Sequence, residues 1–154
     1  AVMTGHLVLA TVHANDTAAA LMRLLDLGVE PNLIASSANL ILAQRLVRLL
    51  CSRCKVSRVP TADERNAMRA AAADARQIYG PTGCSRCLNT GYKGRRALFE
   101  LLVVNDAVRQ VILGSPTVQS LREAGLRGDA MSDAGWQAVA LGSTSVDELH
   151  RAVN

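Results

Sequence analysis

The sequence predicts an α/β fold from three observations. Residues 7–12 form an unbroken apolar run with β-branched side chains, which is typical of a strand buried on both faces of a parallel sheet. Apolar stretches with helical spacing and alanine-rich stretches dominate the rest of the chain. Four cysteines in two C-x-x-C pairs interrupt these stretches and indicate a small separate subdomain.

The opening run has no partner strand of its own kind nearby. A single strand cannot form a sheet, so we expect the sequence to start within a larger α/β domain. The chain of 154 residues is long enough for one sizeable domain or two small ones. The longest apolar stretch, residues 33–50, is broken by polar side chains, so we expect no transmembrane segment.

The setting suggested by these features is cytoplasmic. The first residues lack the basic lead and cleavage signature of a signal peptide. Paired C-x-x-C motifs in such a chain favour a reducing compartment.

The charge balance does not favour nucleic acid as a partner. Four metal-bound thiolates and one Zn²⁺ would reduce the formal charge of +4 to about +2. Aromatic residues make up only 3% of the chain, whereas single-strand binding surfaces need stacking rings among their cations. We therefore expect most arginines to cover solvated helix faces.

The cysteine pairs share the same local sequence, C-S-R-C, at residues 51–54 and 84–87. Two such turns facing each other create a tetrahedral four-sulfur site, so Cys51, Cys54, Cys84 and Cys87 are the expected zinc ligands. Arg53, Lys55 and Arg86 flank the turns, and cations beside cysteine favour the thiolate. Two disulfides, or four unlinked buried cysteines, are the alternatives.

A closed four-cysteine site has no open coordination position for a catalytic water. The expected zinc is therefore structural, and any chemistry lies elsewhere. The long spacer between the two cysteine pairs must fold outward as its own element.

The helices can be placed from caps and breakers. Asn15, Asp16 or Thr17 can cap a helix that runs to about Leu27 and ends at Gly28. Its apolar positions lie on one face: Ala20, Leu21, Leu24 and Leu25. A second, long helix is expected over residues 32–50.

The middle of the chain carries clearer boundary signals. Thr61 and Glu64 form a capping-box pattern, and the alanine-rich stretch that follows predicts helix to about Tyr79, in one piece or two. Residues 89–94 predict a hairpin turn, and residues 95–104 a strand that returns into the fold. Three helices are expected after Asn105, with breaks near residues 114–116, 128–132 and 142–145.

Two histidines flank the predicted opening strand. At about 3.3 Å per residue, the seven steps between His6 and His13 place them roughly 23 Å apart, so they cannot share a metal. Ligands bind beyond the carboxyl ends of strands in open α/β sheets, which favours His13 for function and a structural role for His6. The polar turn after His13 leads into a helix N-terminus, which suits an anion such as phosphate.

Residues 4–15 read TGHLVLATVHAN, with a histidine near each end, and residues 42–48 and the first cysteine pair follow in the chain. With this histidine box begins a resemblance to the secretion ATPases, the hexameric motors of type II secretion and type IV pilus assembly. It resumes at the second pair, at residues 91–95 (GYKGR) and at residues 100–102. The cysteine pairs are similar to those of the type II secretion and pilus-extension branches.

The resemblance implies a C-terminal fragment of a RecA-like P-loop ATPase domain, with a four-cysteine zinc-binding subdomain and a C-terminal helical bundle. Residues 1–50 would belong to the ATPase core, residues 51–96 to the zinc subdomain, and residues 97–154 to the return strand and C-terminal helices. The phosphate loop and the acidic magnesium motifs would lie upstream, because the chain contains no G-x-x-x-x-G-K-[ST]. This polypeptide alone is therefore expected neither to bind ATP tightly nor to hydrolyse it.

The resemblance also implies roles for individual residues. His13 would sense the γ-phosphate or position the attacking water, with His6 supporting the box, and Arg95 would lie near the nucleotide. Gln44 and Arg45 match a family motif, but no contact can be assigned to them. For Gln44, a structural place at a helix interface agrees with the sequence as well as a functional role does.

The implied partners follow from the same family. They are identical subunits in a hexamer, and the inner-membrane platform and cytoplasmic adapter proteins of the secretion or pilus machine. The parent would use ATP and magnesium, and would be cytoplasmic and peripheral to the inner membrane.

Two other classes compete with this reading. A standalone zinc module would bind proteins or nucleic acid without ATP, and it should bury its own opening strand. A truncated motor should instead expose the edges of that strand or pair them with another copy. A zinc enzyme is disfavoured by the all-thiolate ligand set.

Overall fold

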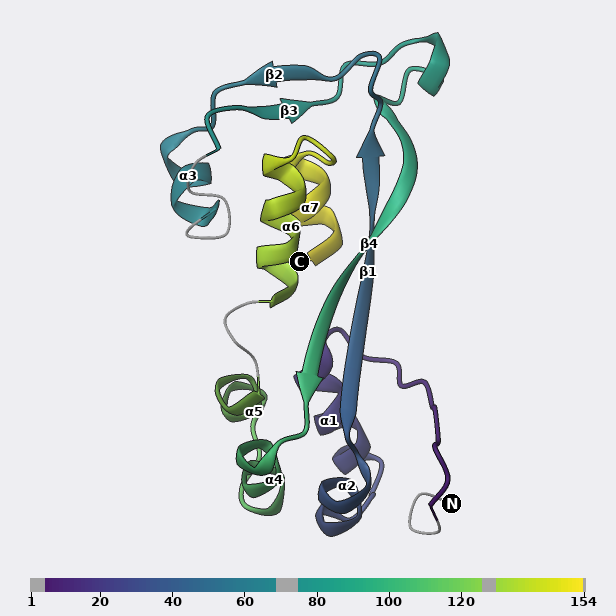
Figure 1. Ribbon diagram of the computed structural model, residues 1–154, viewed down its shortest axis with the longest axis vertical. Coiled ribbons are helices and arrows are strands. Elements are labelled where there is room, and N and C mark those ends of the chain that lie inside the picture. Colours follow the sequence, from purple (N-terminus) through teal and green to yellow (C-terminus); the bar gives the residue numbers. More distant parts are fainter. Residues whose placement is uncertain (1–4, 69–74, 126–129, 154) are drawn as a thin grey trace. The chain divides into compact units, whose positions relative to one another are not determined.

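The computed structural model describes residues 5–68, 75–125 and 130–153 (Figure 1). The chain divides into two compact units, each built from two stretches of sequence. Unit 1 comprises residues 1–43 and 100–128, and unit 2 comprises residues 44–99 and 129–154. Two long paired strands, β1 (Leu40–Leu50) and β4 (Tyr92–Val103), contribute residues to both units.

Unit 1 is mainly helical. It contains α1 (Thr17–Asp26), α2 (Pro31–Ser37), α4 (Asp106–Leu113) and α5 (Val118–Gly125). Helix α2 packs against α4, and α5 packs against both α1 and α4. The core of this unit is formed by small and aliphatic side chains: Ala18, Leu21, Ile34, Ala35, Leu102, Val104, Val108, Ile112 and Leu121.

The first helix confirms its sequence signals. The side chain of Asp16 caps α1 by accepting a hydrogen bond of 2.7 Å from the backbone N–H of Ala19. Ala20 and Leu21 are buried, and Leu24 and Leu25 pack partly buried against the same core. The helix ends before Gly28, whose φ of +83° is a conformation that glycine adopts without steric cost.

The prediction of a buried opening strand is wrong for this chain. Residues 6–14 form neither helix nor strand, and Leu7 and Leu9 are 86% and 89% exposed. A strand buried on both faces needs neighbouring strands and covering helices. The described residues provide no such partners for this segment, so its apolar character stays unburied.

The prediction of one long helix over residues 32–50 is also wrong. Helix α2 ends at Ser37, and β1 follows it. Exposed and partly buried side chains alternate along β1 from Leu40 to Leu46, which is the period of a strand. Leucine, alanine, glutamine and arginine favour helix locally, and pairing with β4 overrides that preference. Gln44 is therefore an exposed strand residue, and the alternative that placed it at a helix interface is wrong.

Unit 2 contains the segment between the two cysteine pairs, residues 55–83, which we call the excursion. Strands β2 (Val56–Arg58) and β3 (Ile78–Gly80) pair antiparallel, with Val56 opposite Gly80. Between them lies α3 (Ala62–Met68). Both α3 and β3 pack against α6 (Ala130–Ala140), which packs against α7 (Val146–Val153).

The predicted capping box of α3 is confirmed, whereas the predicted length of this helix is wrong. The N–H of Glu64 donates to Thr61 Oγ1 at 3.2 Å, and the Glu64 carboxylate accepts from the N–H of Thr61 at 2.8 Å. The structure places Ile78 and Tyr79 in β3 rather than at a helix end, because they pair with β2. Part of the predicted helix, residues 69–74, lies outside the described residues.

The return strand is confirmed, although it begins at Tyr92 rather than Arg95. A tight turn precedes it, as predicted, but the strand pairs with β1 and forms no hairpin with the segment before the turn. The described part of the chain after Asn105 contains four helices, where three were predicted. Among the predicted breaks, those near residues 114–116 and 142–145 are confirmed. Of the predicted break at residues 128–132, residues 130–132 belong to α6, and residues 128 and 129 lie outside the described residues.

Within the described ranges, each helix is too short or too polar to span a bilayer.

Candidate functional site

Four cysteine sulfurs converge in unit 2. Cys51 and Cys54 lie in the turn that follows β1, and Cys84 and Cys87 lie at a 3₁₀ turn over Ser85–Cys87. All four Sγ atoms lie within 4.8 Å of one another. The structure therefore brings the predicted ligand set together, from segments that are far apart in the sequence.

The sulfur separations fit a tetrahedral metal site. A Zn–S distance of about 2.3 Å requires sulfurs about 3.8 Å apart at tetrahedral angles. The Sγ atoms of Cys51 and Cys84 are 3.9 Å apart, and those of Cys54 and Cys87 are 3.8 Å apart. A disulfide would need about 2.05 Å, and all four cysteines are free. The disulfide alternative does not describe this geometry, and a metal ion could be held here.

The backbone around the cysteines favours thiolates. Burial raises the pKa of Cys87, but backbone N–H groups of Cys84 and Gly91 donate to its sulfur and lower the pKa to about 6. The pKa of Cys51 is lowered chiefly by the backbone N–H of Arg53. Burial raises the pKa of Cys54. Backbone donors, rather than the flanking cations expected from the sequence, are thus the leading cause of thiolate stabilisation.

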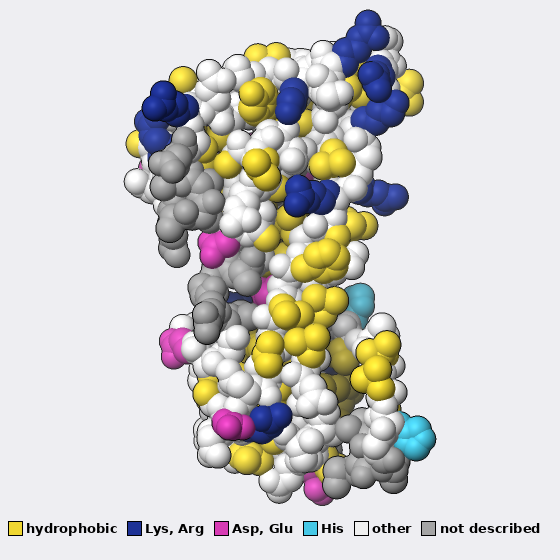
Figure 2. Space-filling model, in the orientation of Figure 1, with side chains coloured by type: hydrophobic (Ala, Val, Ile, Leu, Met, Phe, Trp, Pro, Cys, Tyr) yellow, Lys and Arg dark blue, Asp and Glu magenta, His cyan; other side chains and the backbone are white. Residues whose placement is uncertain are grey.

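Lys55 was predicted to favour the cysteine thiolates, but its side chain contacts Gly142 and Tyr79. Its ammonium donates a hydrogen bond of 2.7 Å to the carbonyl of Gly142 and lies 4.4 Å from the centre of the Tyr79 ring. The neighbouring N–H of Leu50 donates to the carbonyl of Ser143 at 2.8 Å. These contacts attach the first cysteine turn to the loop between α6 and α7. Figure 2 shows other Lys and Arg side chains gathered over the cysteine end of unit 2.

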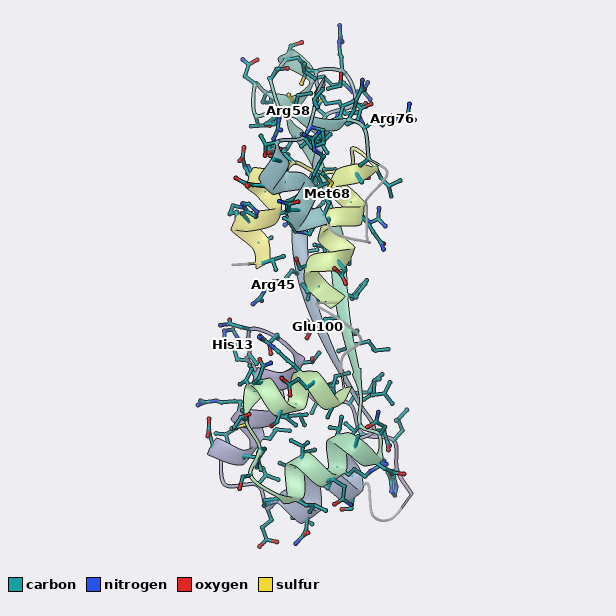
Figure 3. All side chains as sticks on the ribbon, turned by 90° about the vertical axis from the view of Figure 1, so that its left-hand side faces the viewer. His13, Arg45, Arg58, Met68, Arg76 and Glu100 are labelled. Carbon is teal, nitrogen blue, oxygen red and sulfur yellow. The ribbon has the colours of Figure 1, made fainter. Side chains whose placement is uncertain are left out.

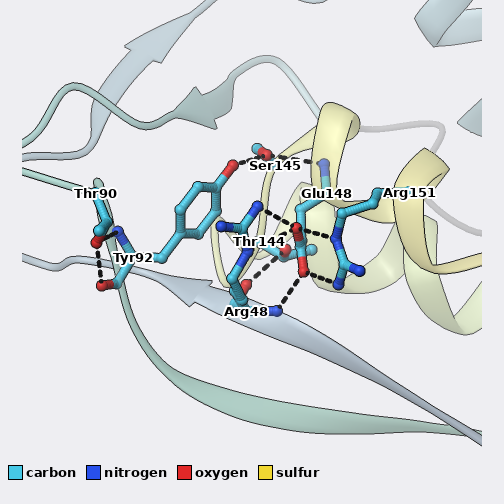
Figure 4. Close-up of polar contacts among 7 residues, drawn as sticks. All are labelled: Arg48, Thr90, Tyr92, Thr144, Ser145, Glu148 and Arg151. Atoms are coloured by element: carbon cyan, nitrogen blue, oxygen red, sulfur yellow. Dashed lines mark hydrogen bonds and ion pairs between the residues drawn. The ribbon is translucent and has the colours of Figure 1, made fainter.

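A buried carboxylate holds α7 against β1 (Figure 4). The side chain of Glu148 is fully buried and accepts hydrogen bonds from the backbone N–H, Nε and Nη2 of Arg48. It also accepts bonds of 2.9 and 2.6 Å from Arg151. The Arg151 bonds and then the Arg48 bonds outweigh burial and lower the pKa of Glu148 to about 2, so the carboxylate stays ionised.

Arg48 connects this network to a pocket beside it. Its guanidinium carbon lies 4.2 Å from the centre of the Tyr92 ring, and the Tyr92 hydroxyl is 2.7 Å from Ser145 Oγ. Arg95, the residue predicted to lie near a nucleotide, lines a pocket of about 400 Å³ in unit 2. The rest of its lining is Arg48, Thr90, Tyr92 and Gly94.

The two predicted histidines lie in unit 1, on the segment that forms no regular structure. His13 lines a cavity of about 340 Å³ beside α1, with Asn15, Arg23 and Asp26. His6 lines a separate cavity of about 500 Å³ next to the start of β1, with Asn39 and Leu40. The structure therefore gives the two histidines different surroundings, as the sequence argument required. Both are exposed.

The start of α1 is already supplied with carboxylates. Thr17 donates from its N–H at 2.9 Å and from Oγ1 at 2.5 Å to Glu100 Oε1. Glu100 is buried, and it is labelled with His13 in Figure 3. Because Asp16 and Glu100 occupy two of the N–H groups at this helix end, those groups are not open to a phosphate.

Sequence reasoning missed the buried acids as organising residues. Ser145 and Glu148 follow the S-x-x-E pattern of a helix start, and the Glu148 N–H does donate to Ser145 Oγ at 3.2 Å. The pattern locates the helix but gives no hint that the Glu148 carboxylate turns to Arg48. No local signal pairs Glu100 with Thr17.

Comparisons with known proteins agree on one family. A family model described as Type II/IV secretion system protein matches residues 1–151. Type II secretion system protein HxcR of Pseudomonas aeruginosa is 43% identical over 97% of this chain and 29% of its own length. Type II secretion system ATPase E of Vibrio cholerae is 39% identical over 97% of this chain and 30% of its own length.

A relative named for pilus assembly is similar over a smaller part of the chain. The type IV pilus assembly ATPase PilB of Thermus thermophilus is 43% identical over 82% of this chain and 14% of its own length. The chain thus spans less than a third of the length of each of these relatives.

Proposed function

Because the chain belongs to the family described as Type II/IV secretion system protein, we propose that it is the C-terminal portion of a cytoplasmic hexameric ATPase that powers type II secretion. In this proposal the motor drives pseudopilus assembly at the inner membrane, together with platform and adapter proteins. One observation carries the proposal: the match over residues 1–151 includes His6, His13, all four cysteines and Arg95. Relatives named as ATPases of secretion and of pilus assembly support the activity.

Residues 1–50 are proposed to complete a RecA-like ATPase core in the longer protein, with residues 51–96 as its zinc subdomain. The exposure of Leu7 and Leu9 supports this arrangement, because an apolar segment without strand partners is what a separated core strand would leave. It argues against the second candidate, a standalone zinc module, which would have to bury this segment itself. The phosphate loop, ATP and magnesium belong to the longer protein, so the chain alone is expected to be inactive.

His13 is proposed to act at the γ-phosphate, by sensing it or by positioning the attacking water, with His6 supporting the segment. Arg95 is proposed to lie near the nucleotide. Cys51, Cys54, Cys84 and Cys87 would hold one structural zinc that fixes the excursion, because four thiolates leave no open position on the metal.

The roles of the histidines can be tested in the full-length protein. His13→Ala should lower the rate of ATP hydrolysis by about tenfold or more and change nucleotide affinity little. The reason is that positioning the attacking water affects mainly turnover. His150→Ala is the matched control, since His150 is an exposed histidine whose ring contact is with Trp136 in unit 2. Unchanged hydrolysis in His13→Ala would remove this residue from the site.

The inactivity of the chain alone has its own test. Purified residues 1–154 should show no ATP turnover above the background of a mock purification. Turnover that follows the chain through successive columns would overturn the proposal that the phosphate loop lies elsewhere.

A further inference from the structure

The lining of the pocket beside β4 includes none of the four cysteines and neither His6 nor His13. It has a volume of about 400 Å³ and is lined by Arg48, Thr90, Tyr92, Gly94 and Arg95. Two of these five residues carry guanidinium groups, and none carries a carboxylate. The lining therefore has the composition of a site for an anion.

The positive charge around the pocket exceeds what the nearby acid can neutralise. One carboxylate, Glu148, is shared by Arg48 and Arg151. Within the described ranges, Arg95 takes part in no ion pair. The bonds from Arg48 to Glu148 use Nε, Nη2 and the backbone N–H, so its Nη1 amino group is not engaged by this acid.

The backbone leaves the pocket open at one position. Gly94 lies inside a strand, where glycine is unfavourable unless the backbone must bend or be approached closely. Its φ is +87°, a conformation that L side chains rarely adopt, and it places no side chain over the pocket. At Gly94 the lining therefore consists of backbone without a side chain.

The walls of the pocket are held in place before any ligand arrives. The Tyr92 ring is fixed by its hydroxyl contact with Ser145 and by the stacked Arg48 guanidinium. Thr90 Oγ1 contacts the Cys87 carbonyl at 2.7 Å and accepts from the N–H of Tyr92 at 3.3 Å. A preorganised wall lowers the entropic cost of binding.

We propose that this pocket binds an oxyanion of the phosphate class, held by the guanidinium groups of Arg95 and Arg48. Arg48 can turn part of its hydrogen-bonding capacity to the anion because Arg151 continues to neutralise the buried Glu148. The inference rests on the proposed function only for the nucleotide as a source of phosphate, and the pocket geometry stands without it. A phosphorylated headgroup of a lipid offers the same chemistry.

The test is a calorimetric titration of the 154-residue chain with inorganic phosphate and with pyrophosphate. Saturable binding is expected, and Arg95→Ala should weaken it about tenfold or more, since a hydrogen-bonded charge contributes on that scale. Arg96→Ala is the matched control, because Arg96 is the next residue of β4, is exposed and does not line the pocket. Its affinity should stay unchanged.

Arg48 needs a milder substitution, because its removal leaves Glu148 with one partner fewer. Arg48→Lys keeps the charge and should weaken pyrophosphate binding while the chain still unfolds cooperatively. The absence of saturable binding of both anions would overturn the proposal. Equal weakening by Arg95→Ala and Arg96→Ala would also overturn it, since that result would indicate diffuse attraction to a basic surface.

Competition against bound pyrophosphate then identifies the source. Displacement by ATP assigns the pocket to a nucleotide, and displacement by phosphatidylcholine vesicles containing phosphatidic acid assigns it to a lipid headgroup. The nucleotide role proposed for Arg95 is tested separately, by ATP turnover of the full-length protein. Normal turnover in Arg95→Ala, with anion binding lost in the chain, would refute that role and leave the pocket proposal intact.

Discussion

Arg48 and Glu148 lie 100 residues apart in the sequence, yet Arg48 donates three hydrogen bonds to the Glu148 carboxylate. This contact joins strand β1 to helix α7, and it lies beside the first cysteine pair. The N–H of Leu50 and the side chain of Lys55 bond to the loop that leads into α7. The cysteine site and the C-terminal helices are therefore parts of one unit, so disturbing either should be measurable in the other.

Glu148→Gln should lower the free energy of unfolding by about 3 kcal/mol, because it removes a buried charge that two arginines require. Urea denaturation followed by circular dichroism measures this change. Asp147→Asn is the control on the same helix turn, since Asp147 is exposed and its removal should change stability by less than about 0.5 kcal/mol. Equal stability of Glu148→Gln and the parent chain would show that the contact is not stabilising.

The stability should also depend on acid pH. The pKa values of Glu148 and Glu64 are lowered in the folded state to about 2, from an ordinary value near 4.5. Their stabilisation is therefore complete above about pH 4.5 and is lost as the pH falls toward about 2. Unfolding curves recorded from about pH 7 down to about pH 2 measure this loss, because that range includes both the ordinary and the lowered pKa of the two glutamates. Glu148→Gln should flatten the profile, and an equally steep profile would assign the loss to other groups.

Metal analysis should find close to one zinc per chain, bound by the four cysteines that lie within 4.8 Å of one another. Removal by a chelator should loosen residues 50–96 and the attached loop between α6 and α7, measured by hydrogen exchange. Cys84→Ser should reduce zinc content, whereas Ser85→Ala, at the next and exposed position, should leave it unchanged. A metal-free chain with two disulfides would contradict the assignment.

Gly142→Ala should destabilise unit 2 by more than about 1 kcal/mol. Gly142 has a φ of +64°, and an added Cβ would lie 2.5 Å from Tyr79 Cδ2. Gly80→Ala is the control, because a Cβ there meets no atom within 4 Å. Comparable melting temperatures for the two variants would mean that the loop before α7 yields without cost.

The opening segment should tolerate polar substitution in this chain. Leu9→Ser should change the free energy of unfolding by less than about 0.5 kcal/mol, because Leu9 is 89% exposed. Leu21→Ala, in the fully buried core of unit 1, should cost about 2–5 kcal/mol. A large loss in Leu9→Ser would show that residues 6–12 are buried in solution.

Features set by neighbouring residues were predictable from the sequence. The capping residue Asp16, the Thr61–Glu64 capping box and the glycine end of α1 depend on hydrogen bonds within one helical turn. The convergence of the four cysteines was also predictable, because the repeated C-x-x-C spacing is that of a four-sulfur metal site. The resemblance to secretion ATPases is confirmed by the family match over residues 1–151.

The tertiary structure decided what local sequence could not. Residues 40–50 have helical preferences, yet they form β1 because β4 supplies the hydrogen-bonding partner. Residues 7–12 have the composition of a buried strand, yet they stay exposed because the described part of the chain provides no partner strand for them. Likewise, only folding brings Glu148 to Arg48, since a buried charge finds its partners through space. The local preference for helix contributes roughly a few tenths of a kcal/mol per residue, and pairing with a strand distant in the sequence outweighs it.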